Sequence, residues 1–433
     1  MNTYKNLCFG GDNMAYQQLG KLYYGNKDVY IQTYKTRFDS EDTVKLDFMV
    51  GSNQAFFVQN TEVLTLAYAI ARLDKSVTKL CTTLPGVAKT QYSQKCLIDE
   101  IVLTNKIEGV HSSRKEIDEA LDILAKQSVK KGKRHRFVGL VNKYLKLLTQ
   151  EDVPLTTCQD IRAIYDEVFL NEVIAEDPHN APDGKTFRKD ISQIHSETDK
   201  VIHKGLYPES KIIDAVQKAL DILNDSSIDA LFRICVFHYL IEYIHPFYDG
   251  NGRLGRFILS YCLSENLEPL LSYRISETIK ENINEYYKAF KICNDPHNLG
   301  DLTPFLIMLL KMICTALKDL EESLQRKLFD WKQYERFVGT FAETSDGSVR
   351  SMYSILIQAA LFSEKGISTE ELISGFGKSY YTVRKILGKI RPALLVAEMK
   401  GKSKYYQLDL LTLDEMILQQ ELQEASGAPV PNR

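Results

Sequence analysis

The chain has 433 residues, of which 44% are hydrophobic and 26% are charged, and its formal net charge is −3. These values are typical of a globular protein with roughly two or three hydrophobic cores, and they give no whole-chain sign of nucleic-acid binding. The eight cysteines form no C-x-x-C pair and no apolar run reaches membrane-spanning length. We therefore expect a soluble, cytoplasmic protein without a disulfide framework, a zinc site or a membrane segment.

The chain begins with mixed patterning that becomes helical. Residues 1–60 are rich in aromatic side chains, and alternation over 29–34 (VYIQTY) favours a short strand or hairpin. From Thr61 the apolar residues recur at helical spacing, until the sequence LPG at 84–86 breaks the pattern. We therefore expect a long helix over roughly 61–83.

A second predicted helix covers about 88–109 and ends at Gly109, a residue type common just past a helix end. Ser113 and Glu116 then have the spacing of a capping box for a third helix. The basic run 130–136 (KKGKRHR) is either a nucleic-acid patch or a solvated connector, and we favour the connector.

Further along, 177–184 (DPHNAPDG) is dense in turn-forming residues. The following segment, 185–207, predicts two short strands, one around 187–188 and one around 201–203. A surface hairpin is therefore expected here.

The segment 245–256 (HPFYDGNGRLGR) brings together several groups of chemical interest between two apolar helical patterns. Glycines at a helix start let an anion approach unpaired backbone N–H groups, and Arg253 and Arg256 are spaced to share a helix face. Asp249 offers a hard oxygen suited to Mg²⁺, and the imidazole of His245 belongs to a residue type that exchanges protons near neutral pH. The alternative is a structural turn beside two solvated arginines.

At every defining position the segment matches HPFx[D/E]GNGRxxR, and it therefore resembles the Fic family. The resemblance implies an α-helical catalytic domain, here over 126–325, that transfers AMP from ATP to a Ser, Thr or Tyr hydroxyl of a target protein. It implies that His245 is the general base and Asp249 the Mg²⁺ ligand. The phosphates would be bound by Gly250, Asn251, Gly252, Arg253 and Arg256.

A second resemblance lies in 104–109 (TNKIEG), which is similar to the family's inhibitory motif [S/T]xxxE[G/N]. Thr104 and Glu108 are one helical turn apart and face the same way. The resemblance implies that Glu108 reaches Arg256 and blocks productive nucleotide binding, within an N-terminal region over 1–125. An ordinary surface glutamate is the alternative, and a role of Glu108 in removing AMP is another.

Two further resemblances concern the nucleotide base and the target. Tyr287 and Asn294 resemble residues that approach the adenosine in relatives, although an aromatic packing stripe would look the same. The hairpin at 185–207 resembles the family's flap, which would hold the target by strand addition.

The C-terminal part, 340–424, predicts three helices and a hairpin, and it resembles a winged helix. Between 378 and 404 there are eight Lys or Arg and one Glu, a local charge of 8 − 1 = +7. This charge suits DNA binding, although winged helices also dock proteins. We expect 425–433 to be a disordered tail.

The sequence thus predicts a mainly α protein with a Fic-type domain that uses ATP and Mg²⁺ to adenylylate a protein, and a homodimer is one assembly to test. Two alternatives stay open at this point. One is a Fic enzyme that transfers UMP, phosphate or phosphocholine, or that removes AMP. The other is a DNA-binding regulator whose Fic site only senses a nucleotide.

Overall fold

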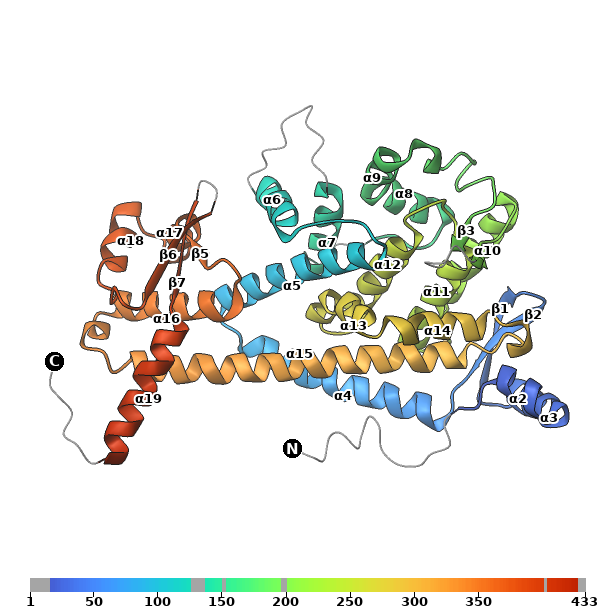
Figure 1. The fold of residues 1–433 in the computed structure, drawn as a ribbon, viewed down its shortest axis with the longest axis horizontal. Coiled ribbons are helices and arrows are strands. Elements are labelled where there is room, and N and C mark those ends of the chain that lie inside the picture. The colour runs from blue at the N-terminus through green and yellow to red at the C-terminus, as the bar shows by residue number, and fades with distance from the viewer. Residues whose placement is uncertain (1–15, 126–136, 150–152, 196–200, 401–402, 427–433) are drawn as a thin grey trace. The chain divides into compact units, whose positions relative to one another are not determined.

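The computed structural model describes residues 16–125, 137–149, 153–195, 201–400 and 403–426 (Figure 1). Helices dominate these ranges, as the sequence predicts, and the described strands form small antiparallel sheets. The chain divides into two compact units, one made of Met1–Val77 with Cys96–Leu320 and the other of Thr78–Lys95 with Glu321–Arg433.

The first unit starts with two helices and a hairpin: α2 (Leu19–Gly25), α3 (Lys27–Phe38), β1 (Thr43–Val50) and β2 (Asn53–Val58). The strand predicted over 29–34 is wrong, because these residues belong to α3. The side chain of Asn26 caps this helix by accepting hydrogen bonds from the N–H groups of Asp28 and Val29, at 3.0 and 3.2 Å. Tyr30 is the one buried residue of α3, so alternating burial never develops.

Long helices follow: α4 (Thr61–Thr83), α5 (Gly86–Ile107) and α6 (Arg114–Ala125). The predicted break before residue 86 is confirmed, and Gly109 has the left-handed φ of 74° that ends many helices. The predicted capping pair is confirmed too, because Ser113 N–H donates to Glu116 at 2.8 Å and Glu116 N–H donates to Ser113 Oγ at 3.3 Å.

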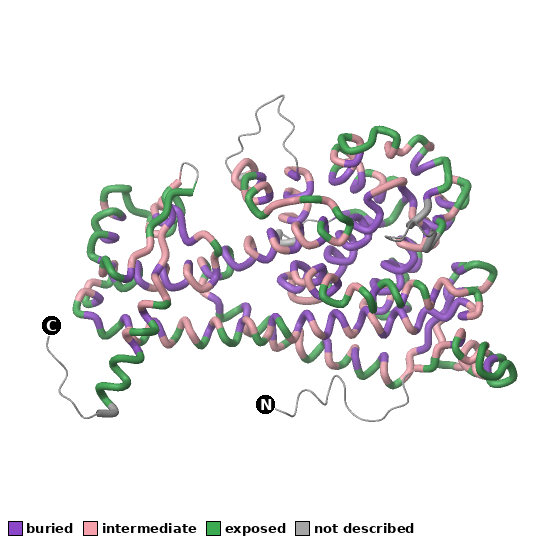
Figure 2. Tube along the Cα trace, in the orientation of Figure 1, coloured by how far each residue is buried: buried purple, intermediate pink, exposed green. Residues whose placement is uncertain are grey.

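A helical bundle completes the first unit. It contains α7 (Val138–Thr149), α8 (Cys158–Val168), α9 (Leu170–Glu176), α10 (Glu209–Asn224), α11 (Ala230–Ile244), α12 (Asn251–Asn266), α13 (Ile275–Glu281) and α14 (Ile283–Cys293), with 3₁₀ turns at Pro178–Asn180, Pro269–Tyr273 (η2) and Pro296–Asn298. Most residues of α11 and α12 are buried (Figure 2). Such all-round burial fits the apolar residues on nearly every face of α11, whereas the buried residues of α12 include Arg253, Arg256 and Ser260.

The hairpin before α10 differs from its prediction. Its strands are β3 (Gln193–His195) and β4 (Val201–Lys204), which pair antiparallel. The second strand lies where the sequence predicts it, but Phe187 and Arg188 lie outside any strand. Both side chains are fully buried, and the ring of Phe187 contacts that of Phe247 edge-on. They anchor the segment that leads into the hairpin.

Helix α15 (Thr303–Val338) leads into the second unit, which contains the 3₁₀ turn Ala342–Ser345, α16 (Gly347–Phe362), β5 (Ile367–Ser368), α17 (Thr369–Phe376), α18 (Tyr380–Leu387), β6 (Leu395–Lys400), β7 (Ser403–Leu408) and α19 (Leu410–Ser426). The sheet has the order β5-β7-β6. Ser368 and Glu371 have the sequence spacing of a capping box, and they form one at the start of α17. The sequence pattern predicts the third helix of this unit over 379–394, but α18 ends at Leu387, since Gly388 and Pro392 follow it.

Helix α19 was missed by the sequence analysis. It extends through Ser426, so residues 425 and 426 of the predicted tail are helical, and residues 427–433 lie outside the described ranges. The predicted basic loop 130–136 and residues 401–402 of the predicted hairpin turn also lie outside them.

Candidate functional site

The segment 245–256 forms the junction between α11 and α12, which is the helix–turn–helix that the sequence predicts. Helix α11 ends at Ile244, and His245 adopts a left-handed conformation with φ of 55°. Gly250, with φ of 79°, precedes the first residue of α12. A non-glycine residue at positive φ is uncommon and is held by its surroundings. At His245 one such restraint is the Nε of Arg188, which donates to the backbone carbonyl at 2.9 Å.

Two side chains hold the loop against the bundle. Phe247 is fully buried and stacks on Tyr165, with ring centroids 3.6 Å apart and ring planes at 5°. Asn251 closes the turn, because its amide oxygen accepts from Phe247 N–H and its amide nitrogen donates to Phe247 O, both at 2.9 Å. The side chain of Asn251, predicted to hold phosphates, thus hydrogen-bonds the loop backbone here.

Asp249 lies at the start of α12 and is partly exposed. Its carboxylate accepts from Gly250 N–H at 2.5 Å, and its backbone carbonyl accepts from the hydroxyl of Tyr165 at 3.1 Å. The 16-residue helix that follows directs its first-turn N–H groups and its positive dipole end toward this loop. Gly250, Asn251 and Gly252 therefore form a backbone arrangement suited to an anion.

Arg256 meets both predicted inhibitory residues. It is 1% exposed and pairs with the carboxylate of Glu108 at 2.8 Å. Its Nε donates to Thr104 Oγ1 at 2.9 Å, and a terminal nitrogen donates to Thr104 O at 3.1 Å. Burial alone would lower the pKa of this guanidinium, but the neighbouring Glu108, with Tyr286 and Glu242, raises it instead. Arg256 therefore stays charged and paired.

Arg253 has different partners. Its guanidinium, also 1% exposed, pairs with Glu172 of α9 at 2.9 Å and lies 5.6 Å from the ring centre of Phe169. Its Nε and its second terminal nitrogen are buried, with no hydrogen-bond partner among the described residues. The two arginines thus share a helix but not a partner, and Glu172 was missed by the sequence analysis.

Two glycines of α12 lie directly beneath carboxylates. A Cβ atom at Gly252 would overlap the Oε1 of Glu108, and one at Gly255 would overlap the Oε1 of Glu242. That oxygen of Glu242 is buried and has no hydrogen-bond partner in the described part of the chain. Burial raises the pKa of Glu242 to about 8, although Arg256 lowers it and Glu108 raises it further. The sequence analysis missed Glu242, although a carboxylate one turn before His245 on an otherwise apolar helix is a signal that could have found it.

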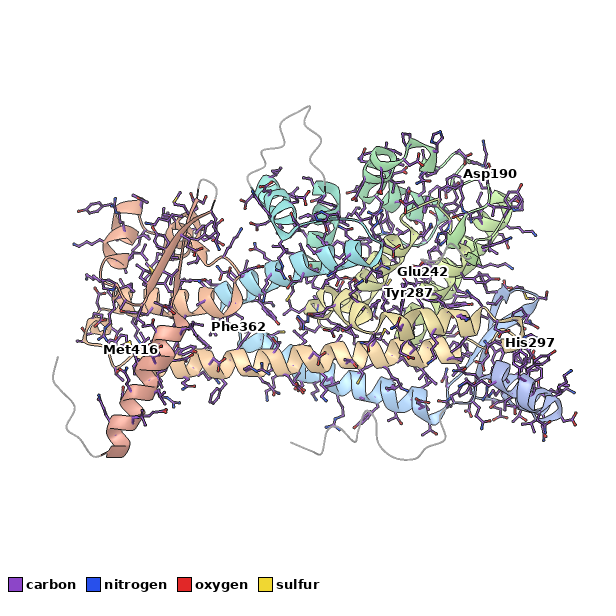
Figure 3. The ribbon with its side chains drawn as sticks, in the orientation of Figure 1. Asp190, Glu242, Tyr287, His297, Phe362 and Met416 are labelled. Atoms are coloured by element: carbon purple, nitrogen blue, oxygen red, sulfur yellow. The ribbon has the colours of Figure 1, made fainter. Side chains whose placement is uncertain are left out.

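The two predicted adenosine contacts lie in different parts of α14. Tyr287, labelled with Glu242 in Figure 3, is half-exposed near the middle of the helix. Burial raises the pKa of its phenol to about 12, with Glu108 adding to the shift. Asn294 follows the helix end, and its amide oxygen accepts from the hydroxyl of Tyr239 at 2.7 Å. The structure therefore brings Tyr287 close to Glu108 and places Asn294 beside α11.

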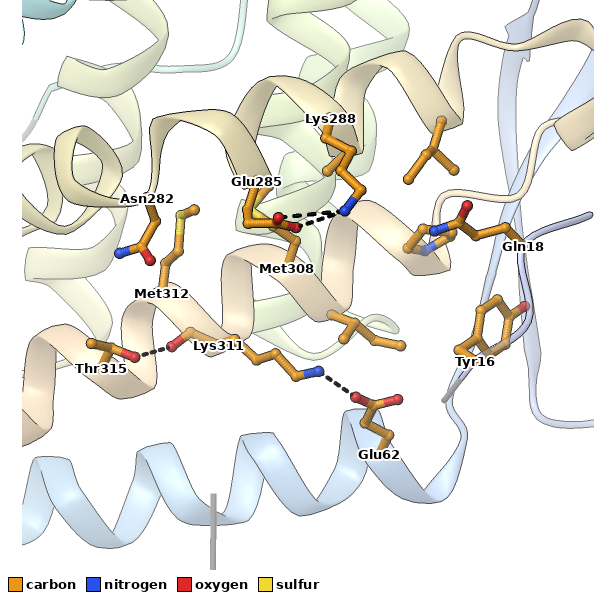
Figure 4. Close-up of a pocket in the computed structure, with 14 residues that line it drawn as sticks. Tyr16, Gln18, Glu62, Asn282, Glu285, Lys288, Met308, Lys311, Met312 and Thr315 are labelled. Atoms are coloured by element: carbon orange, nitrogen blue, oxygen red, sulfur yellow. Dashed lines mark hydrogen bonds and ion pairs between the residues drawn. The ribbon is translucent and has the colours of Figure 1, made fainter. Parts of the chain in front are cut away.

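A separate pocket of about 480 Å³ lies between α4, α14 and α15 (Figure 4). Its size suits a small molecule, but none of the motif residues line it. Its four charged side chains pair with each other, Lys311 with Glu62 at 2.6 Å and Lys288 with Glu285 at 3.3 Å. We therefore assign the functional site to the α11–α12 loop.

Two features are absent from the described residues. No cluster of three or more His, Cys, Asp or Glu side chains in those ranges is placed to bind a metal ion. No described helix has both the length and the apolar character needed to cross a bilayer.

Comparison with known proteins points to one family. The family model for the Fic/DOC family matches residues 155–263. Protein adenylyltransferase fic-1 of Caenorhabditis elegans is 29% identical over 143 residues, which are 32% of this chain and 23% of that protein. The Caenorhabditis briggsae protein of the same name is 31% identical over 118 residues, 27% of this chain and 20% of that protein. The match thus spans about a fifth of these relatives' length.

A Fic family protein from Desulfovibrio desulfuricans G20 shares the fold, with a TM-score of 0.50 at 18% identity over 81% of this chain and 96% of that one. The family match covers α8–α11 and most of α12, and it includes the complete HPFYDGNGRLGR segment. The similarity to the Fic/DOC family therefore lies in residues 155–263.

Proposed function

We propose that the chain is a protein adenylyltransferase, which transfers AMP from ATP to a hydroxyl group of a target protein. The observation that carries the proposal is the α11–α12 junction. There the HPFYDGNGRLGR segment opens a helix N-terminus beside Asp249, with buried Arg253 and Arg256 on the following turns. Backbone donors and guanidiniums are the groups that stabilise a triphosphate in transfer reactions.

In the proposed reaction, the imidazole of His245 takes the proton from the target hydroxyl. The hydroxyl oxygen then forms a bond to the α-phosphorus of ATP, and the bond from that phosphorus to the α,β-bridging oxygen breaks. Pyrophosphate leaves with that electron pair, so AMP remains on the target. The first turn of α12 would orient the phosphates, which is the main task in phosphoryl chemistry.

The residues present fit Mg²⁺ in one respect. The partly exposed carboxylate of Asp249 stands at the helix start where phosphates would bind, and Mg²⁺ commonly takes one or two carboxylates with phosphate oxygens and water. Asp249 would hold the ion, which would neutralise phosphate charge when bound.

Self-inhibition by Glu108 is the second part of the proposal. Glu108 occupies Arg256 and stands over Gly252, which are two of the groups predicted to receive the phosphates. Glu108→Gly should raise self-modification with labelled ATP, because Arg256 and Gly252 become open to the nucleotide. An unchanged or lower rate would reject inhibition by Glu108. Loss of AMP removal from pre-modified protein in the same variant would instead favour the AMP-removing role.

Target binding through the flap is supported by how that hairpin joins the loop. Leu206 N–H donates to Ile244 O at 3.0 Å just after β4, and Arg188 N–H donates to Pro246 O at 3.3 Å before β3. Both ends of the flap segment are thus tied to residues flanking His245. An added strand on β3–β4 would bring a target hydroxyl to the imidazole.

The decisive experiment is mass spectrometry of the Glu108→Gly protein incubated with ATP and Mg²⁺. A covalent AMP adduct is expected, and His245→Ala in that background should reduce it at least about 100-fold. His179→Ala is the matched control, since that side chain is 94% exposed. Retained transfer without His245 would overturn the base assignment. An adduct formed only from UTP or a phosphocholine donor would identify another transferred group.

The same assay bears on the homodimer. At two protein concentrations, a rate per mole that rises with concentration would indicate transfer between copies of the chain. A constant rate would indicate transfer within one copy or within a stable homodimer, and the molecular mass in solution tells these two apart.

For the C-terminal unit we propose a winged helix that contacts DNA through α18. Tyr380, Tyr381, Arg384 and Lys385 are exposed on that helix, while Val383, Ile386 and Leu387 are buried. Part of the local positive charge is paired, since Lys389 bonds Asp346 and Arg391 bonds Glu343, both at 2.7 Å. Replacing Arg384 and Lys385 by alanine should therefore reduce the salt dependence of duplex binding by about two ions. Absence of binding at low salt would remove DNA as a partner.

A further inference from the structure

Helix α5 and the turn that directly follows it carry polar residues at a strict interval of four. Glu100, Thr104 and Glu108 lie on one face of this segment, and all three meet α12. Glu108 faces Gly252, Thr104 faces Arg256, and Glu100 faces Ser260, so the two helices run antiparallel with matched four-residue steps. We call this set of three contacts the polar ladder.

Glu100 forms the deepest step of the ladder. Its side chain is fully buried, and one carboxylate oxygen accepts from Ser276 Oγ at 2.5 Å and from Ser260 Oγ at 3.5 Å. The other oxygen accepts from Ser276 N–H at 2.9 Å. A carboxyl group buried in this way is stable only while these donors stay aligned. Glu100 therefore joins α5 to both α12 and α13.

The geometry makes Glu100 and Glu108 interdependent. Eight residues of helix span about 12 Å, and a slip of one residue would rotate α5 by about 100°. Such a slip would take Glu100 away from Ser276 and Glu108 away from Arg256 together. The neighbouring side chains Leu97 and Ile101 are also buried, but apolar contacts tolerate sliding better than directional hydrogen bonds do.

The groups facing Glu100 are few. Arg256 comes from α12, Tyr144 from α7 and Tyr273 from η2. Burial raises the pKa of Glu100 to about 7, whereas the bonds from Ser276, the charge of Arg256 and the bond from Ser260 lower it. A neutral amide of the same shape can accept from Ser276 N–H with its oxygen, while its nitrogen donates to the hydroxyl oxygens of Ser276 and Ser260.

We infer that Glu100 is a positioning residue, which holds α5 in the register that places Glu108 on Arg256. The inference rests on the proposed inhibition by Glu108 and extends it to a residue two turns away. Glu100 hydrogen-bonds Ser260 and Ser276 rather than the HPFYDGNGRLGR segment, and it interacts with Arg256 of that segment only through charge. It would act through the register of the polar ladder, so that weakening it releases Glu108.

A double-mutant cycle tests this role. The measured quantity is the dissociation constant for a non-hydrolysable ATP analogue with Mg²⁺, in the full chain. Glu100→Ala should tighten binding about tenfold when Glu108 is present, and less than about twofold in the Glu108→Gly background. A residue needed only for folding would weaken binding in both backgrounds, and that result would overturn the inference.

Two milder variants keep the test decisive if Glu100→Ala does not fold. Glu100→Gln keeps one acceptor oxygen for Ser276 N–H and exchanges the other for an N–H donor that the two serine hydroxyls can accept, so binding should stay within about twofold of the wild type. Ser276→Ala removes one donor and should tighten binding by a few-fold, again only with Glu108 present. Equal changes in both backgrounds, or none from Ser276→Ala, would contradict the positioning role.

The outcomes also separate this inference from the function on which it rests. If Glu108→Gly itself leaves analogue binding unchanged, the proposed inhibition is wrong and Glu100 has nothing to position. If Glu108→Gly tightens binding while Glu100→Ala and Ser276→Ala do not, inhibition stands and only the role of Glu100 falls.

Discussion

Two buried arginines of α12, Arg253 and Arg256, have carboxylate partners from different parts of the chain. Arg253 pairs with Glu172, which lies inside the matched Fic domain and is 11% exposed. Arg256 pairs with Glu108, which lies upstream of that domain and is 29% exposed. Both guanidiniums are equally buried, so the difference lies in where the carboxylate comes from and how easily it can leave.

This contrast separates a scaffold contact from a replaceable one. Arg253 pairs with Glu172 of α9, and removing this carboxylate would leave a buried positive charge without its partner. Arg256 keeps two bonds to Thr104 even without Glu108, so a ligand can replace the carboxylate at lower cost. A pairing that another anion can replace is what a regulatory contact requires.

The largest expected effect is on the Arg253 side. Glu172→Gln should lower the free energy of unfolding by about 3 kcal/mol, because the amide leaves a buried guanidinium without its countercharge. Urea unfolding followed by circular dichroism measures this loss. Glu176→Gln on the exposed side of α9 is the control. A loss of stability no larger than that of the control would mean that the Arg253–Glu172 pair is no more important for folding than the Arg256–Glu108 pair.

On the Arg256 side, pH should act through Glu100. Its pKa is about 7 in the folded protein against an unfolded reference of 4.5, so the fold favours the protonated form. The stabilisation is complete below the reference value and is lost as pH rises through the folded value. The opening free energy of α5, from hydrogen exchange corrected for intrinsic rates, should therefore fall by about 2 kcal/mol between pH 5 and 8.

Glu100→Gln should flatten that change, while Glu242→Gln should leave it in place. Because both variants retain the rest of the Arg256 surroundings, the comparison isolates one carboxyl group. A pH profile that is the same in wild type and Glu100→Gln would show that Glu100 does not titrate in this range.

A smaller effect is expected for Glu108→Gln. Stability should fall by about 1 kcal/mol or less, since Thr104 still bonds Arg256 and the site is partly exposed. Affinity for an ATP analogue should rise about fivefold, which corresponds to about 1 kcal/mol. Calorimetric titration measures the affinity, with exposed Glu119→Gln as the control. A stability loss matching that of Glu172→Gln would make Glu108 a scaffold residue.

The smallest effect should come from removing the hydroxyl of Tyr287. Tyr287→Phe keeps the ring, so analogue affinity should change less than about twofold if the ring stacks on adenine. Tyr287→Ala should weaken binding by about 1 kcal/mol or more, because stacking is lost. If the phenylalanine variant is as weak as the alanine variant, the hydroxyl near Glu108 carries the contribution instead.

Much of this site could be predicted from the sequence because its elements are local. The helix–turn–helix at 245–256 follows from Pro246, the glycines and the apolar flanks, and Thr104 and Glu108 follow from helical spacing. What could not be predicted is tertiary. Spacing suggests that Arg253 and Arg256 share a face, but only the bundle decides which neighbouring helix meets each guanidinium.

The same limit explains the other residues that the sequence analysis missed. Glu100 looks like any helix glutamate until α13 supplies Ser276 N–H to it. The sequence pattern places Arg188 in a strand, whereas in the structure its guanidinium donates to backbone carbonyls, among them that of His245. In α3 a local cap at Asn26 outweighed an alternating pattern, which is a weak signal without burial.

The absence of a side chain at Gly252 affects how inhibition by Glu108 should depend on salt concentration. Attraction between Glu108 and Arg256 is electrostatic, and ions in solution weaken such forces where solvent reaches them. The tip of Glu108 also fills the space above Gly252 that even one methyl group would need, and this steric effect does not depend on ionic strength. A phosphate that approaches the Gly252 backbone must therefore displace the tip at any ionic strength, and salt should ease this displacement only as far as it weakens the pair with Arg256.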